Sequence, residues 1–162
     1  MIKKVLVEVS SILKKNSLQN CKKIKNLLRA SGLGDVECNT IEPLYGLEGN
    51  FSLEEIQRIA QELLCDPIAE KFIIDAEPKD FKTIFLDVWF KSGVTDPVAE
   101  SVLKAIRDLN IMTIENAFFG MRYEFEEIAQ AREKSVDEKL IFFANQHLLN
   151  PLVQQCQLIK YS

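Results

Sequence analysis

The chain has 162 residues, of which 47% are hydrophobic and 27% are charged, and its formal net charge is −4. This balance is ordinary for a globular protein, and the length is sufficient to bury a core. No apolar run reaches the length of a membrane span and the N-terminus lacks a signal-peptide pattern, so we expect a cytoplasmic protein without a membrane partner.

The first half predicts five elements in the order strand, helix, strand, helix, strand, at residues 3–9, 21–30, 36–41, 51–64 and 72–74. Pro43 is expected to end the second strand, because proline cannot donate to a sheet ladder. The second helix is the clearest, since Ser52 and Glu55 form a capping-box pattern before its apolar stripe. Residues 75–82 then read as a polar linker.

The second half repeats this order at residues 84–90, 97–109, 114–125, 135–148 and 153–159. Asp96 is the expected N-cap of its first helix and Pro97 the first helical residue, where a missing N–H costs nothing. Ser135 and Glu138 form a second capping-box pattern.

The two halves also align residue by residue. Val5 corresponds to Ile84 at an offset of 79, and Tyr45 to Tyr123 at an offset of 78. We therefore predict an α+β fold built by tandem duplication of one strand-helix-strand-helix-strand module, with modules at residues 1–78 and 79–162. We expect antiparallel sheets with helices packed on one face, and the modules packed sheet against sheet across a pseudo-twofold axis, like a covalent homodimer.

A glycine-containing turn before a helix could form a phosphate site, and Gly93 lies in such a turn. Asp96 places its own anion where a phosphate would sit, and Pro97 removes one N–H donor. The sequence therefore favours a self-capped structural corner over a nucleotide site.

Positive charge is concentrated in residues 1–30, which hold eight Lys or Arg and one acidic residue, Glu8. No aromatic residue precedes Tyr45, so the stacking partners typical of single-stranded nucleic-acid sites are missing there. We expect a solvated or protein-docking face and no nucleic-acid partner.

The sequence offers few candidates for catalytic or metal-binding residues. The four cysteines lack paired spacing and read as free thiols, and the helical position of His147 favours a semi-buried structural histidine over a nucleophile's base. Glu8 and Asp87 lie mid-strand at equivalent positions, as expected on the polar face of a half-exposed sheet. No phosphate loop, dinucleotide fingerprint or zinc motif occurs. We expect no catalytic residues, no metal and no cofactor.

Lys91 to Pro97, reading KSGVTDP, resembles the Lys-Pro-Gly-Val-x-Asp-Pro signature of the S subunit of phosphoribosylformylglycinamidine (FGAM) synthase, with Ser92 in place of the first proline. Residues 47–67 resemble the N-terminal region of longer FGAM synthases, in which two S-like modules occur in tandem. The first module has residues 11–19 where the second has this signature.

The resemblance implies a non-catalytic accessory component of purine biosynthesis. Such a component bridges an ATP-dependent synthetase and a glutaminase and supports ammonia transfer. Its candidate docking residues here are those of the corner turn: Lys91, Ser92, Gly93, Val94 and Thr95.

Three further apolar residues could belong to a docking surface. Ile141 and Phe142 take the places of polar residues in the matching first-half helix, and a buried position between layers is an equal option for them. Trp89 could dock a partner or fill the seam between modules. Self-association is a further option. A regulatory module that binds a small metabolite at the seam is the alternative function, followed by a stand-alone enzyme.

Overall fold

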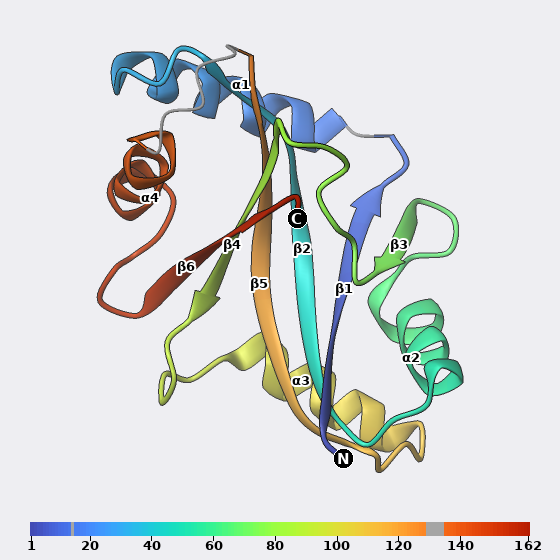
Figure 1. Ribbon diagram of the computed structural model, residues 1–162. Coiled ribbons are helices and arrows are strands. Elements are labelled where there is room, and N and C mark those ends of the chain that lie inside the picture. The colour runs from blue at the N-terminus through green and yellow to red at the C-terminus, as the bar shows by residue number, and fades with distance from the viewer. Residues whose placement is uncertain (14, 129–134) are drawn as a thin grey trace.

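The computed structural model describes residues 1–13, 15–128 and 135–162, and within these ranges the strands form one six-stranded antiparallel sheet (Figure 1). The strand order is β3-β1-β2-β5-β4-β6. The strands are β1 (Lys3–Ser11), β2 (Val36–Gly49), β3 (Glu70–Ile74), β4 (Thr83–Phe90), β5 (Ile114–Glu127) and β6 (Gln154–Lys160). The helices are α1 (Lys15–Ala30), α2 (Leu53–Ile59), which continues as a π-helical turn (Ala60–Leu64), α3 (Pro97–Asp108) and α4 (Ser135–His147).

The register of the sheet is symmetric about its centre. β2 pairs with β5, and the pair Pro43–Met121 has matching neighbours on either side: Leu44 opposite Gly120 and Glu42 opposite Arg122. The β1–β2 and β4–β5 pairs show the same symmetry, because Glu8 lies opposite Leu44 and Asp87 lies opposite Arg122 at equivalent places. The α+β prediction with antiparallel strands is confirmed.

The expected packing of sheet against sheet is wrong. The two halves join edge to edge along β2 and β5, because these long strands satisfy each other's backbone hydrogen bonds along the seam. A single sheet therefore runs through both halves, and the division into modules 1–78 and 79–162 stays a prediction.

The helices pack on one face of the sheet. The register places the helix-contacting residues of β1, β2, β4 and β5 on the same side, in two apolar clusters. In the first cluster the α2 segment and α3 cover mainly β1 and one end of the seam, around Val7, Leu47, Ile56 and Ile106. In the second, α1 and α4 cover β4 and the other end of the seam, around Leu28, Leu86, Phe125 and Phe143. Each cluster contains residues from both halves of the chain.

Helix capping fixes where two helices begin. Ser52 Oγ accepts the Glu55 N–H at 3.2 Å, and Glu55 Oε2 accepts the Ser52 N–H at 2.8 Å. Asp96 caps α3, and Pro97 is its first residue. The side chain of Ser135 lies outside the described residues, so the capping role of Ser135 and Glu138 stays a prediction.

Two element boundaries differ most from the sequence prediction, the end of β2 and the start of α1. β2 continues through Pro43 to Gly49. The pairing of β2 with β1 ends at Leu44, so at Pro43 that edge of the strand has no hydrogen-bonded neighbour and a missing N–H is tolerated. α1 begins at Lys15 rather than at Cys21. Its first described side chains carry no buried apolar residue before Cys21, and Leu18 is exposed, so the apolar pattern does not mark these turns.

Candidate functional site

The corner turn is fixed on three sides. Gly93 has a φ of 82°, which favours glycine. Asp96 Oδ1 accepts the Ala99 N–H at 3.0 Å, and Asp96 Oδ2 accepts the Phe119 N–H of β5 at 2.9 Å. Lys91 Nζ donates to the carbonyl oxygen of Pro151, before β6, at 2.6 Å. Both carboxylate oxygens of Asp96 are engaged, so the turn presents a rigid loop rather than a vacant helix N-terminus.

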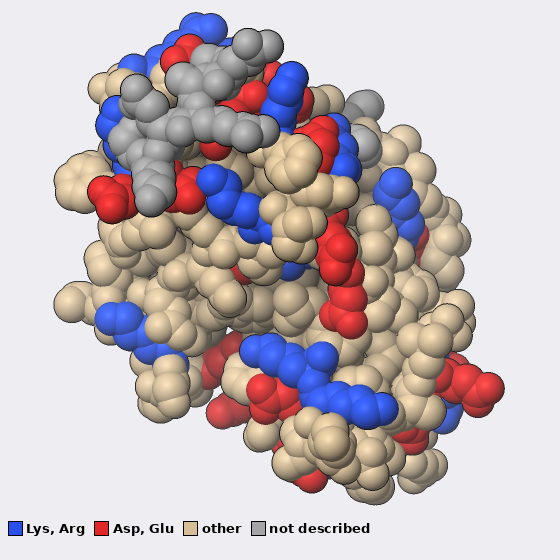
Figure 2. Space-filling model, in the orientation of Figure 1, with Lys and Arg blue, Asp and Glu red and all other residues tan. Residues whose placement is uncertain are grey.

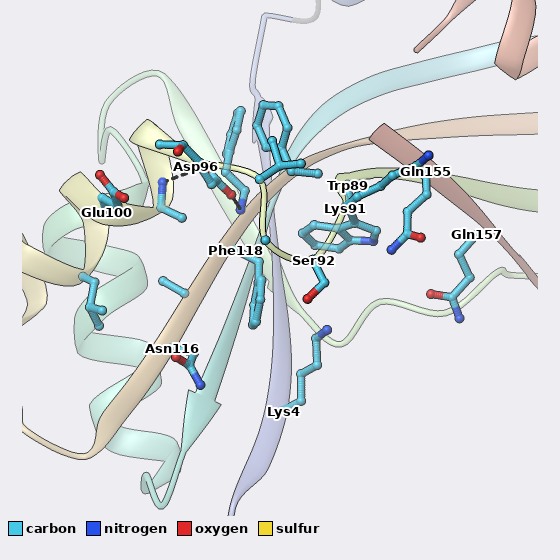
Figure 3. A pocket seen from close by; sticks show the side chains of 18 residues that line it. Lys4, Trp89, Lys91, Ser92, Asp96, Glu100, Asn116, Phe118, Gln155 and Gln157 are labelled. Carbon is cyan, nitrogen blue, oxygen red and sulfur yellow. Dashed lines mark hydrogen bonds between the residues drawn. The ribbon is translucent and has the colours of Figure 1, made fainter. Parts of the chain in front are cut away.

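A hollow of about 470 Å³ lies beside this turn, and we call it the corner hollow (Figure 3). All five candidate residues of the turn line it, together with Trp89. Lys4 of β1 reaches into the same place, its Nζ 5.6 Å from the ring centroid of Trp89 and 4.8 Å from that of Phe118. Amide side chains from β5 and β6 complete the wall: Asn116, Gln155 and Gln157.

Gly120 makes room for the indole of Trp89. The two residues lie opposite each other in the β4–β5 pair. A Cβ at position 120 would lie 2.4 Å from the Val88 carbonyl oxygen and 2.7 Å from the Trp89 ring. Glycine at this position therefore allows Trp89 to lie close against β5 on the helix-free face of the sheet.

A buried ion cluster lies on the same face, near the pseudo-twofold axis. Arg122 Nε donates to Asp87 Oδ1 at 2.7 Å and Arg122 Nη2 to Asp87 Oδ2 at 2.8 Å, a bidentate pair. Arg122 Nη1 donates to Glu8 Oε2 at 3.2 Å. Arg122 is 1% exposed and Asp87 is fully buried. One arginine thus joins an acidic residue from each half of the chain.

The linker covers this cluster. Residues 75–82 cross the helix-free face between β3 and β4 (Figure 1), Pro78 is buried, and the carbonyl oxygen of Ala76 accepts from Arg122 Nη1 at 3.4 Å. Burial raises the pKa of Glu8, against the opposing attraction of Arg122. The exposed polar face expected for Glu8 and Asp87 is therefore wrong, because both residues are buried beneath the linker.

Sequence reasoning missed Arg122. Its signal was a single basic residue within a strand, on the face shared with the alternating residues Phe118 and Glu124 and opposite two mid-strand acids. Knowing which strands pair was necessary to read it, because the acids lie 114 and 35 residues away.

Ile141 and Phe142 lie elsewhere, on α4. They are 39% and 63% exposed, so neither is wedged between layers in this chain. Phe142 lines a second hollow with residues of the α1 C-terminus, among them Ala30 and Ser31, and we call it the helix hollow. His147 is exposed with its ring 5.0 Å from that of Phe143, so the expected semi-buried position is wrong.

The described residues contain no group of three or more His, Cys, Asp or Glu side chains arranged to hold a metal ion. In the same part of the chain, no helix combines the length and apolar character needed to span a membrane. Figure 2 shows basic and acidic side chains side by side around the lower part of the helix-free face, so neither sign of charge dominates there.

Residues 83–160 match the family model described as PurS: Phosphoribosylformylglycinamidine (FGAM) synthase. These residues form a PurS domain. The PurS match runs from β4 to β6 and includes Trp89, the corner turn, Arg122 and α4. A PurS domain implies a component of FGAM synthase, in purine biosynthesis. The match does not extend into residues 1–82, and no curated protein matches the chain.

Proposed function

We propose that this chain is a non-catalytic accessory component of FGAM synthase. It docks the ATP-dependent synthetase and the glutaminase components and supports ammonia transfer between them. Residues 1–78 act as a second, diverged S-like module beside the PurS domain, so that one chain takes the place of a dimer. The PurS match over residues 83–160 is the observation that carries this proposal.

The symmetry of the sheet supports the tandem part of the proposal. Both halves run β-α-β-α-β, and the cross-strand pairs Glu8–Leu44 and Asp87–Arg122 occupy equivalent places about the axis. A dimer of identical S-like modules would need this twofold arrangement, since a closed pair uses the same surface of both members.

Two separate surfaces support the bridging part. The corner hollow has an exposed turn with Ser92 and Thr95 at its rim and Trp89 in its wall. The helix hollow carries exposed Phe142, with exposed Ile141 beside it on α4. Neither Ile141 nor Phe142 lines the corner hollow. Two docking surfaces on different elements suit a component that contacts two partners.

The test is reconstitution from purified parts. The chain is mixed with the synthetase and glutaminase components, and glutamine-dependent amidine formation is measured alongside gel filtration. We expect the chain to co-elute with the components and to be required for glutamine-dependent activity. Activity that is indifferent to the chain, together with no co-elution, would refute the proposal.

Surface variants locate the docking sites. Ser92→Arg at the corner and Phe142→Ser on α4 should each weaken association by about tenfold or more, near 1.4 kcal/mol. The matched controls are Gln61→Arg, which adds the same charge at another exposed position, and Ile68→Ser, at a residue 89% exposed. If the controls weaken association equally, these surfaces are not the docking sites.

A second candidate function is regulation by a small molecule bound in the corner hollow. The observation that favours it is the convergence of Lys4 from the first half with Trp89 and Phe118 from the second. Rings, amides and one ammonium group are typical of a site for a small polar ligand. A saturable rise in Tm with a single amino acid or nucleotide, lost in Trp89→Ala, would favour this function over docking.

A further inference from the structure

Two cysteines from consecutive elements meet where helix α1 packs on strand β2. Cys21 lies in α1 and Cys38 in β2, and their Sγ atoms are 3.2 Å apart. Neither cysteine is in a disulfide. A disulfide bond requires about 2.05 Å between the sulfurs, so the two atoms need to approach by little more than 1 Å.

We propose that Cys21 and Cys38 are a modification site that forms an intrachain disulfide by exchange with a small disulfide such as glutathione disulfide. The site is independent of FGAM synthase docking, because it lies where α1 packs on β2 and lines neither the corner hollow nor the helix hollow.

The environment of the two cysteines makes the first thiol–disulfide exchange slow and the second one fast. Cys21 is buried and Cys38 half-buried. The hydrogen bond with Cys21, followed by burial, raises the pKa of Cys38, so little thiolate is present near neutral pH. The first attack on a disulfide is therefore slow. Once one cysteine carries a mixed disulfide, the second sulfur is already in contact and displaces the adduct.

Glutathione disulfide is the only reagent that this reaction needs. The Cys38 thiol loses its proton and its sulfur attacks one sulfur of glutathione disulfide, releasing one glutathione thiolate. The Cys21 thiol then loses its proton and attacks the Cys38 sulfur, releasing the second glutathione. Two protein thiols are oxidised to one disulfide, and one glutathione disulfide is reduced to two thiols.

The consequence is a covalent link between a helix and the central seam of the sheet. Cys38 lies opposite Phe125 of β5, at the bulge where the β2–β5 register shifts. α1 reaches over this seam through Ile24 and Leu28, which pack in one cluster with β4 residues such as Leu86. Linking Cys21 to Cys38 therefore fixes α1 to β2, one of the two strands that meet at the junction between the halves.

The test uses the full chain with Cys65 and Cys156 changed to Ser, so that only this pair remains. The protein is incubated with glutathione disulfide at about pH 8.5, near the ordinary pKa of a thiol. It is then unfolded, treated with N-ethylmaleimide and weighed by mass spectrometry. We expect the loss of two hydrogen atoms and no maleimide adduct, reversed by dithiothreitol. The oxidised protein should melt about 6–12 °C higher than the reduced one, from the closure of a short loop.

Cys21→Ser and Cys38→Ser in the same background are the matched controls, and each should keep one thiol that carries maleimide or a single glutathione. Three outcomes in the parent overturn the proposal: two maleimide adducts after oxidation, a stable glutathione adduct, or disulfide-linked dimers. Association with the synthetase and glutaminase is measured separately. Failure to form the disulfide overturns this proposal and leaves the docking proposal standing, and failure to associate does the reverse.

Discussion

Replacing Arg122 tests whether the buried ion cluster holds the two halves of the chain together. Arg122→Met removes the charge and keeps much of the side-chain length. Glu8 and Asp87 then remain buried without their shared partner. Breaking a buried pair by removing one member costs about 3–5 kcal/mol.

The contact with Phe85 adds to this cost. The guanidinium carbon of Arg122 lies 4.4 Å from the ring centroid of Phe85, and a desolvated contact of this kind contributes about 0.5–2 kcal/mol. We expect a total loss of about 4–6 kcal/mol, a large part of the roughly 5–15 kcal/mol typical of a folded protein. For a chain of this size the smaller figure lowers Tm by about 8–16 °C.

The assay is urea unfolding followed by circular dichroism, with Tm from calorimetry. The matched control is the triple variant Glu8→Leu, Asp87→Leu, Arg122→Met, which removes all three charges. It should recover much of the lost stability, because it removes two buried acids together with the arginine. Glu42, which is 5% exposed and lies opposite Arg122, stays buried in both variants, so the comparison isolates Glu8 and Asp87. A single variant within about 1 kcal/mol of the wild type, or a triple variant no more stable than the single one, would refute the reasoning.

Three further predictions concern the cluster and the corner. Burial raises the pKa of Glu8, so the stability that this carboxyl group contributes is full below about pH 4.5, its ordinary pKa, and is lost as pH rises through the raised pKa of the folded state. Urea titrations across this pH window should show a flatter pH dependence of stability for Glu8→Gln than for the wild type. An equally steep pH dependence would contradict the assignment. Gly120→Ala should cost about 1–3 kcal/mol and shift the emission of Trp89, the single tryptophan, whereas Gly34→Ala, with open space around it, should do neither. Asp96→Ala leaves two backbone N–H groups without their acceptor and should cost about 2–4 kcal/mol in urea unfolding; an unchanged midpoint would mean that water replaces the carboxylate.

Local signals were sufficient for the fold class and for the corner. Proline, aspartate and glycine restrict the backbone over a few residues, so the Asp96 cap and the turn at Gly93 could be predicted from their neighbours alone. The repeated order of elements could also be read from the chain, because hydrophobic periodicity is a local property.

Long-range pairing was not accessible in the same way. The Glu8–Arg122 contact depends on β5 lying between β2 and β4, and no local pattern states that order. The Cys21–Cys38 contact depends likewise on how α1 crosses β2. Burial of Glu8 required the linker to cross the sheet, and polar composition suggested only that the linker is exposed.

The single arginine at the centre of the sheet makes the two halves chemically different at equivalent positions. The position equivalent to Arg122 in the first half is Leu44, which is fully buried. A symmetric pair of first halves would bury two copies of Glu8 with no cation between them, and a pair of second halves would bury two arginines with two aspartates. In this chain Arg122 is shared between Glu8 of the first half and Asp87 of the second. A copy of the first half in place of the second would leave the buried acids without a cation, so the charge balance at the centre of the sheet depends on residues from both halves.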